Sequence, residues 1–178
     1  MTSWAASAPV AWPCVGRGDL VALLARMYAA PTCRGVVIEG PAGIGKTRLA
    51  DEFIHGLGGV TPLRCVGTVA GQTVPYSAIA HLIPGDLSQQ GAEDPRLVLE
   101  AVRNGLTGKR TVLMADDVAL LDESSLALLM HLLALDQVFL VGTVRSDHTV
   151  PPGLDSLIRS FDLPRVGVVA LNEQEVAA

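Results

Sequence analysis

The residues with the clearest chemical potential form a glycine-rich segment between an apolar run and a helix-like stretch. Its eight residues are Gly40, Pro41, Ala42, Gly43, Ile44, Gly45, Lys46 and Thr47. They match the phosphate-loop (Walker A) pattern G-x-x-x-x-G-K-[ST], in which glycines let backbone N–H groups converge on a phosphate chain. The following helix adds partial positive charge, Lys46 would reach the terminal phosphates, and Thr47 would ligate Mg²⁺. The segment predicts a nucleoside triphosphate site; a chance glycine-rich turn is the alternative.

A pair of acids follows a second apolar run. The run at 111–115 is typical of a buried strand, and it ends in Asp116 and Asp117, as in the Walker B motif. An acid at the C-terminal end of such a strand can hold Mg²⁺, directly or through water, which is the role expected for Asp116. Asp117 is the candidate for polarising an attacking water. The alternative is that Asp117 only caps a loop.

A third polar group follows the apolar run at 138–143. The end of this run delivers Thr143, Arg145 and Ser146 to the edge where parallel sheets bind their ligands. Arg145 could sense the terminal phosphate, or it could be a surface arginine paired with Asp147. Lys46, Asp116, Asp117 and Arg145 form the candidate catalytic set.

Alternating strands and helices must position these groups. Apolar periodicity and turn signals predict strands at 35–40, 61–66, 111–115, 137–143 and 166–170. Helices are predicted at 19–28, with Asp19 as its cap, and at 46–55, 75–82, 95–105, 123–135 and 154–160. This alternation predicts an α/β fold: a P-loop NTPase with a five-stranded parallel sheet flanked by helices on both faces.

Composition limits the classes of protein that remain. The 178 residues are 49% hydrophobic and 17% charged, which predicts one folded domain. No apolar stretch reaches the roughly 18 residues of a membrane span, and the start lacks a basic leader, so a cytoplasmic protein is expected. A net charge of -5 is the wrong sign for gripping nucleic acid directly. Three cysteines without C-x-x-C spacing predict buried thiols, and the four histidines lack metal-ligand spacing.

Four segments together resemble one family. They are Val15-Gly16-Arg17, GPAGIGKT, MADD with LLDESSLALL after it, and LVGTVRS. Over residues 14–178 the chain resembles the AAA-like, STAND-class ATPase module of large LuxR-type transcriptional regulators; the loop at 72–76 is also similar. The resemblance implies a P-loop fold of the ASCE/STAND type with ATP or ADP and Mg²⁺ as ligands. It also implies that Gly16 and Arg17 lie near the adenine and that Arg145 is the sensor.

The local sequence pattern and the resemblance together predict a domain organisation and a function. We expect an irregular arm at 1–13, an ATPase domain at 14–170, and the truncated start of a helical lid at 171–178. DNA would be bound only through a C-terminal domain absent from this chain, and self-association on ATP binding is a further expectation. The expected function is a slowly hydrolysing ATP switch. The alternatives are a nucleotide-binding module without turnover and a small-molecule kinase, for which residues 84–94 offer no basic side chain.

Overall fold

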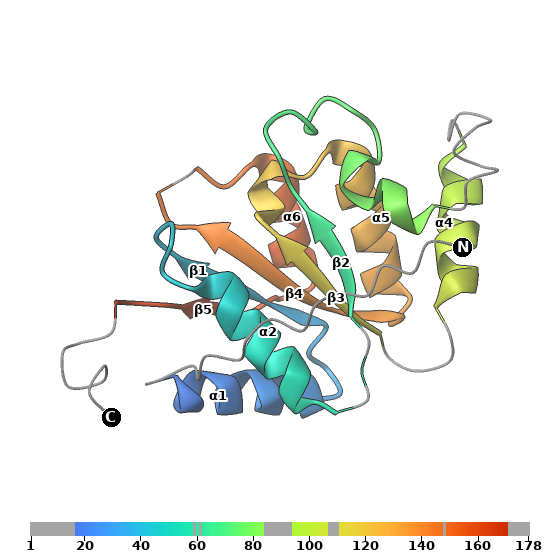
Figure 1. Ribbon diagram of the computed structural model, residues 1–178. Helices are drawn as coiled ribbons and strands as arrows, with labels where there is room; N and C mark the ends of the chain where they lie inside the picture. The colour runs from blue at the N-terminus through green and yellow to red at the C-terminus, as the bar shows by residue number, and fades with distance from the viewer. Residues whose placement is uncertain are drawn as a thin grey trace, which may run out of the picture.

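The computed structural model describes residues 17–58, 60, 62–83, 94–106, 111–147 and 149–170. The expected arm at 1–13, Gly16 and the expected lid segment at 171–178 lie outside them. In chain order the elements are α1 (Gly18–Ala29), β1 (Gly35–Gly40), α2 (Lys46–Gly56), β2 (Leu63–Val66), the 3-10 helix η1 (Ser77–Leu82), α4 (Pro95–Gly105), β3 (Thr111–Asp116), the 3-10 helix η2 (Val118–Leu120), α5 (Glu123–Ala134), β4 (Val138–Arg145), α6 (Pro152–Ser160) and β5 (Arg165–Gly167) (Figure 1).

The strands form one sheet in the order β2-β3-β4-β1-β5, and every pair in it is parallel. The predicted five-stranded parallel sheet is therefore confirmed. Strand β4 lies between β1 and β3, so the strand that leads into the glycine-rich segment and the strand that ends in the acid pair are not neighbours. In the register of β1 and β4, Gly40 is opposite Arg145. The C-terminal ends of β1, β3 and β4 thus meet along one edge, where parallel sheets bind ligands.

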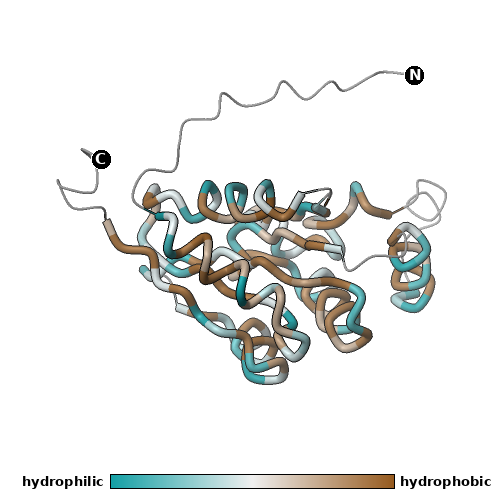
Figure 2. Tube along the Cα trace, turned by 90° about the horizontal axis from the view of Figure 1, so that it is seen from below, coloured by the Kyte–Doolittle hydropathy of each residue, from teal (hydrophilic) through white to brown (hydrophobic). Residues whose placement is uncertain are grey.

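Helices cover both faces of the sheet, as predicted. Alternate strand residues point to opposite faces, so each helix layer receives its own apolar set. The face under α1 and α2 contains Leu24, Val36, Ile38, Leu49, Phe53, Val112, Met114, Phe139, Val141 and Val166. The face under η1, α4, α5 and α6 contains Val37, Cys65, Ile79, Val98, Leu113, Leu129, Leu133, Leu140, Val144 and Leu157. Figure 2 shows mostly brown strands between helices that alternate between brown and teal.

Several boundaries differ from the sequence prediction. The segment predicted as a helix at 75–82 is the 3-10 helix Ser77–Leu82, and β5 is shorter than predicted. Strand β4 continues to Arg145 because its last residues pair with the end of β1. The prediction that Asp19 caps the first helix is wrong. Arg17 occupies that position without a side-chain cap, and Asp19 lies in the first turn, where an acid favours the helix dipole.

The structure describes two of the three cysteines, one buried and one partly buried. Cys65 is buried, and burial, with the charges of Asp116 and Asp122, raises the pKa of its thiol to about 12, so it stays protonated. Cys33 is partly buried and donates its S–H to the carbonyl of Gly35. Cys14 lies outside the described residues. Within the ranges given above, no helix combines the length and the apolar character that crossing a bilayer requires.

Candidate functional site

The glycine-rich segment joins the end of β1 to the start of α2. Gly43 and Gly45 have φ values of 71° and 91°, in the left-handed region that glycine enters without steric cost. Gly40 lies in ordinary backbone, but a Cβ added to it would lie 2.6 Å from the carbonyl oxygen of Val168. Gly43 and Gly45 thus shape the loop, whereas Gly40 lets Val168, just after β5, pack closely at the base of the loop.

Two buried cations hold the carbonyl groups of this loop. The Nζ of Lys46 donates to the carbonyls of Gly40 and Pro41, at 3.0 and 2.9 Å. The guanidinium of Arg17 donates to the carbonyls of Ile44 and Gly45, at 2.5 and 3.4 Å. Since the first turn of a helix leaves its N–H groups without intrahelical acceptors, the start of α2 presents donors at the same place. The loop therefore has the donor set that a phosphate chain needs.

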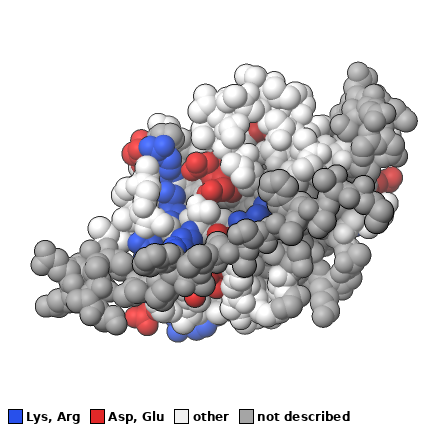
Figure 3. All heavy atoms as spheres, in the orientation of Figure 1, with Lys and Arg blue, Asp and Glu red and all other residues white. Residues whose placement is uncertain are grey.

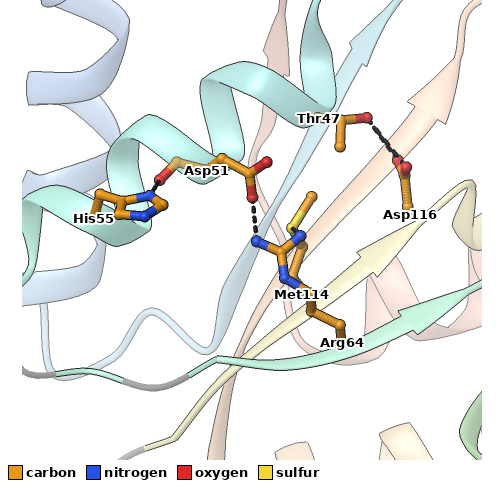
Figure 4. Close-up of polar contacts among 6 residues, drawn as sticks. All are labelled: Thr47, Asp51, His55, Arg64, Met114 and Asp116. Carbon is orange, nitrogen blue, oxygen red and sulfur yellow. Dashed lines mark hydrogen bonds and ion pairs between the residues drawn. The ribbon is translucent and has the colours of Figure 1, made fainter. Parts of the chain in front are cut away.

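Thr47 and Asp116 meet across the sheet edge. The hydroxyl Oγ1 of Thr47 donates to both carboxylate oxygens of Asp116, at 3.0 and 3.1 Å, and Figure 4 shows the two side chains pointing toward one another. Hard divalent cations prefer oxygen ligands, and Mg²⁺ commonly takes one or two from the protein and the rest from phosphate and water. A hydroxyl and a carboxylate converging beside the phosphate loop fit this requirement. Both residues predicted to hold the metal are therefore together.

Thr143 lies at the ligand-binding edge, as predicted, and it connects the two acids, a contact that the sequence did not predict. This side chain from β4 is fully buried; its Oγ1 donates to Asp116 and accepts a hydrogen bond from the backbone N–H of Asp117 at 2.9 Å. The bond fixes the carboxylate of one acid and the backbone of the other. The signal available in the sequence was a lone hydroxyl side chain in the otherwise apolar run 138–144.

Asp117 has an unfavourable backbone conformation. Its φ is 49°, in the left-handed region, which is uncommon outside glycine and is found where neighbouring structure enforces it. Its side chain makes no capping hydrogen bond to η2. The side chain of Asp117 therefore does not cap η2, although its backbone carbonyl accepts from the N–H of Leu120 at 2.8 Å. This backbone conformation leaves the half-buried carboxylate of Asp117 at the end of β3, beside Asp116.

Arg145 forms the ion pair with Asp147 that was the alternative to a phosphate-sensing role. Its Nε and Nη2 donate to the two carboxylate oxygens of Asp147, at 3.1 and 2.7 Å, and these bonds raise the pKa of Arg145. The pair is exposed, yet Arg145 stands opposite Gly40, the first residue of the loop. Figure 3 shows acidic side chains gathered near the middle of this face beside a line of basic ones. Arg145 is thus close to the site but engaged elsewhere.

Asp122 is a buried carboxylate at the N-cap of α5, and no sequence pattern singled it out. It is 2% exposed and caps α5 through the N–H and hydroxyl of Ser125, at 2.9 and 2.7 Å. It also accepts from the N–H of Tyr76 at 2.8 Å, the hydroxyl of Ser77 at 3.2 Å and the N–H of Ala78 at 3.4 Å. Burial favours the neutral acid, but the hydrogen bonds outweigh it and lower the pKa of Asp122. This carboxylate fastens the start of η1 to α5.

An ion pair fastens α2 to the edge of the sheet. Arg64 of the edge strand β2 pairs with Asp51, and its Nη1 lies 3.1 Å from the sulfur of Met114 (Figure 4). Asp51 follows Thr47 by one helical turn. The contact joins the middle of α2 to β2. His55, with its Nδ1 2.8 Å from the carbonyl of Asp51, is exposed on the same helix.

Comparison with known proteins agrees with this geometry. A family model described as AAA ATPase domain matches residues 13–108. The chain is similar in structure to the Aeropyrum pernix ORC1 protein, solved in complex with DNA, with a TM-score of 0.58 and 18% identity over 91% of this chain and 46% of that chain. It is similar to the Pif1 helicase from Candida albicans, with a TM-score of 0.60 and 12% identity over 94% of this chain and 42% of that chain.

A third similar structure is PCH-2 from C. elegans, with a TM-score of 0.51 and 17% identity over 86% of this chain and 42% of that chain. The chain spans less than half the length of each of these three proteins. Comparison with curated proteins finds no match in sequence. At these identities the solved structures show a shared fold.

Proposed function

We propose that this chain, which belongs to the AAA ATPase domain family, binds Mg-ATP at its phosphate loop and acts as a slowly hydrolysing switch. The observation that carries the proposal is the convergence of the loop, Lys46 and the Thr47–Asp116 pair at one sheet edge. The loop N–H groups would hold the phosphate oxygens. Lys46 would exchange its two carbonyl contacts for the terminal phosphates, and Thr47 with Asp116 would hold the metal. Bound Mg²⁺ supplies positive charge to the phosphate oxygens.

Hydrolysis would use the second acid. The oxygen of a water forms a bond to the γ-phosphorus while the bond from that phosphorus to the β–γ bridging oxygen breaks, which yields ADP and inorganic phosphate. The carboxylate of Asp117 orients this water and accepts its proton. Arg145 reaches the γ-phosphate only after it releases Asp147, so charge stabilisation of the transition state is incomplete. We expect turnover well below about 1 per second.

Nucleotide binding is tested by thermal unfolding with the control variant Arg103→Ala on α4. At one hundred times its dissociation constant, Mg-ATP stabilises a folded protein by about 2.7 kcal/mol, which is roughly 5 to 11 °C for a chain of this size. Lys46→Ala is expected to remove this shift, whereas Arg103→Ala, an exposed change far from the loop, is expected to keep it. A shift that survives in Lys46→Ala would contradict the phosphate-loop assignment.

A binding module without turnover is the second candidate, favoured by the Arg145–Asp147 ion pair. Asp117→Ala separates the two candidates when phosphate release and ATP affinity are measured together. For a switch that hydrolyses ATP, the variant loses phosphate release and keeps its affinity. If wild-type protein releases no phosphate above a Lys46→Ala blank, the second candidate is the function.

We further propose that the module serves a LuxR-type transcriptional regulator. The proposal is supported by the segments MADD, LLDESSLALL and LVGTVRS, together with the phosphate loop. ATP binding would then control a DNA-binding domain and would promote self-association. An immunoblot of the native protein in its own cells tests this role, because a band several times larger than 18.6 kDa is expected. A band at 18.6 kDa would contradict a regulator whose DNA-binding domain lies in the same chain.

A further inference from the structure

Arg17 is a buried cation whose contacts all lie on the outside of the phosphate loop. It is 7% exposed, at the N-cap of α1, and its guanidinium donates to the carbonyls of Ile44 and Gly45. It forms no ion pair with any carboxylate in the part of the chain that the structure describes. Its charge is therefore balanced by the dipoles of two loop peptides.

These two peptides carry N–H groups on their opposite sides. In a trans peptide the C=O and N–H point in opposite directions, and no cis peptide occurs in the described residues. The carbonyls that Arg17 binds belong to the peptides whose N–H groups are those of Gly45 and Lys46. Both N–H groups lie at the start of α2, where a helix has no acceptor of its own for them. A charge-assisted bond to the carbonyl polarises each peptide and makes its N–H a stronger donor.

The position of Arg17 is set by the hydrophobic core. Helix α1 packs beside α2 (Figure 1), with Leu24 fully buried and the ring of Tyr28 centred 5.0 Å from that of Phe139. The loop is fitted to the guanidinium, because a Cβ added to Gly45 would lie 3.0 Å from its Nη1. With Lys46 on the carbonyls of residues 40 and 41, both ends of the loop have a cation on their carbonyl side.

We infer that Arg17 is a positioning residue for phosphate binding: it orients and polarises the peptides that end in the N–H groups of Gly45 and Lys46. The inference rests on the proposed nucleotide binding. It differs from an adenine contact, the role that the family resemblance implies for Arg17, because it makes Arg17 serve the phosphates whatever base they carry.

The test uses a ligand with a base and a ligand without one. Binding of Mg-ATP and of magnesium tripolyphosphate is measured by isothermal titration calorimetry for wild type, Arg17→Gln, Arg17→Lys and the control Arg26→Gln. Arg26 is an exposed arginine at the other end of α1. Arg17→Gln is expected to weaken both ligands by the same factor, about tenfold, since hydrogen bonds to a charged group are the stronger ones. Arg17→Lys keeps the charge but not the planar fork, so its loss is smaller. Arg26→Gln leaves both affinities unchanged.

Every other result contradicts either the inference about Arg17 or the proposed nucleotide binding on which it rests. Weaker ATP binding with unchanged tripolyphosphate binding in Arg17→Gln would establish a base contact and overturn the inference, and so would unchanged affinity for both ligands. If wild type binds neither ligand, the proposed function fails. If wild type binds both ligands and Lys46→Ala does not, the proposed function stands, and the Arg17 variants then test only the inference about Arg17. Should Arg17→Gln unfold, as melting without ligand would show, Arg17→Lys decides by the same comparison of the two ligands.

Discussion

The phosphate loop and the acidic strand ends hold their charged groups in different ways. At the loop, Lys46 and Arg17 donate to backbone carbonyls, most of them within a few residues of Lys46 itself. At the acidic end, Asp116 accepts from Thr47, 69 positions away, and from Thr143 of β4. Asp122 accepts from the nearby Ser125 and from three residues that lie 44 to 46 positions away. The loop and Lys46 thus form one local segment, to which packing adds Arg17, whereas most contacts that hold the two acids come from distant elements.

The largest expected effect on stability is the removal of the Asp122 carboxylate. Asp122→Ala leaves the N–H groups of Tyr76 and Ser125 and two hydroxyls without their acceptor, and each unsatisfied buried group costs about 1–3 kcal/mol. We expect a loss of about 3 kcal/mol or more in the free energy of unfolding, measured by urea denaturation. Asp19→Ala, an exposed acid on α1, serves as the control and should cost far less. An equal loss of stability in both variants would show that the fold does not depend on the hydrogen bonds of the Asp122 carboxylate.

The same carboxylate predicts a pH dependence. Because the pKa of Asp122 is lowered in the folded protein, the unfolded chain takes up the proton more readily. Its stabilisation is complete above the ordinary Asp pKa near 4 and is lost as the pH falls through the folded pKa. The difference in unfolding free energy between wild type and Asp122→Asn should therefore narrow from pH 6 to pH 3. A constant difference across that range would contradict the assignment.

Thr143 tests whether the two acids act together. Thr143→Val keeps the shape but removes the hydroxyl that contacts Asp116 and the N–H of Asp117. We expect a loss of about 1–2 kcal/mol in stability and about a tenfold loss of phosphate release, with ATP affinity nearly unchanged. Thr143→Ser retains the hydroxyl and should restore most of the activity. If both variants behave alike, the hydroxyl has no positioning role.

Substitution of Asp117 distinguishes the effect of its backbone conformation on stability from the effect of its carboxylate on hydrolysis. Glycine accepts a φ of 49° without steric cost, so Asp117→Gly should leave the free energy of unfolding unchanged or raise it by about 0.5 kcal/mol. Asp162, at φ 47° in an exposed turn, provides the matched variant Asp162→Gly. Only Asp117→Gly is expected to abolish phosphate release. Loss of release in both would point to a general effect of glycine on the fold.

The smallest effect is expected from the exposed ion pair. Asp147→Ala frees Arg145, and exposed pairs add little to stability, so the melting temperature should stay unchanged. Phosphate release should rise by about two- to threefold, because Arg145 can then reach the γ-phosphate. The double variant with Arg145→Ala should remove this rise. Faster release that persists without Arg145 would exclude it as a sensor.

Much of this molecule could be predicted from local patterns. The phosphate loop lies where its glycine spacing placed it, and the alternation of strands and helices predicted the parallel sheet and its two helix layers. Local pattern is sufficient for these because it reports the backbone conformation and burial of nearby residues. Element ends were less predictable, as the 3-10 helix at 77–82 shows, since tertiary contacts decide them.

Sequence by itself thus determined the fold class, the loop and its lysine, and the identity of the acids at the end of a buried strand. Tertiary structure alone decided the strand order that places β4 between β1 and β3, the bridge from Thr143 to both acids, and the seat of Arg17 on the loop carbonyls. The physical reason is range: a turn or a strand is specified by neighbours in the chain, whereas a hydrogen bond between distant elements depends on how their apolar faces pack.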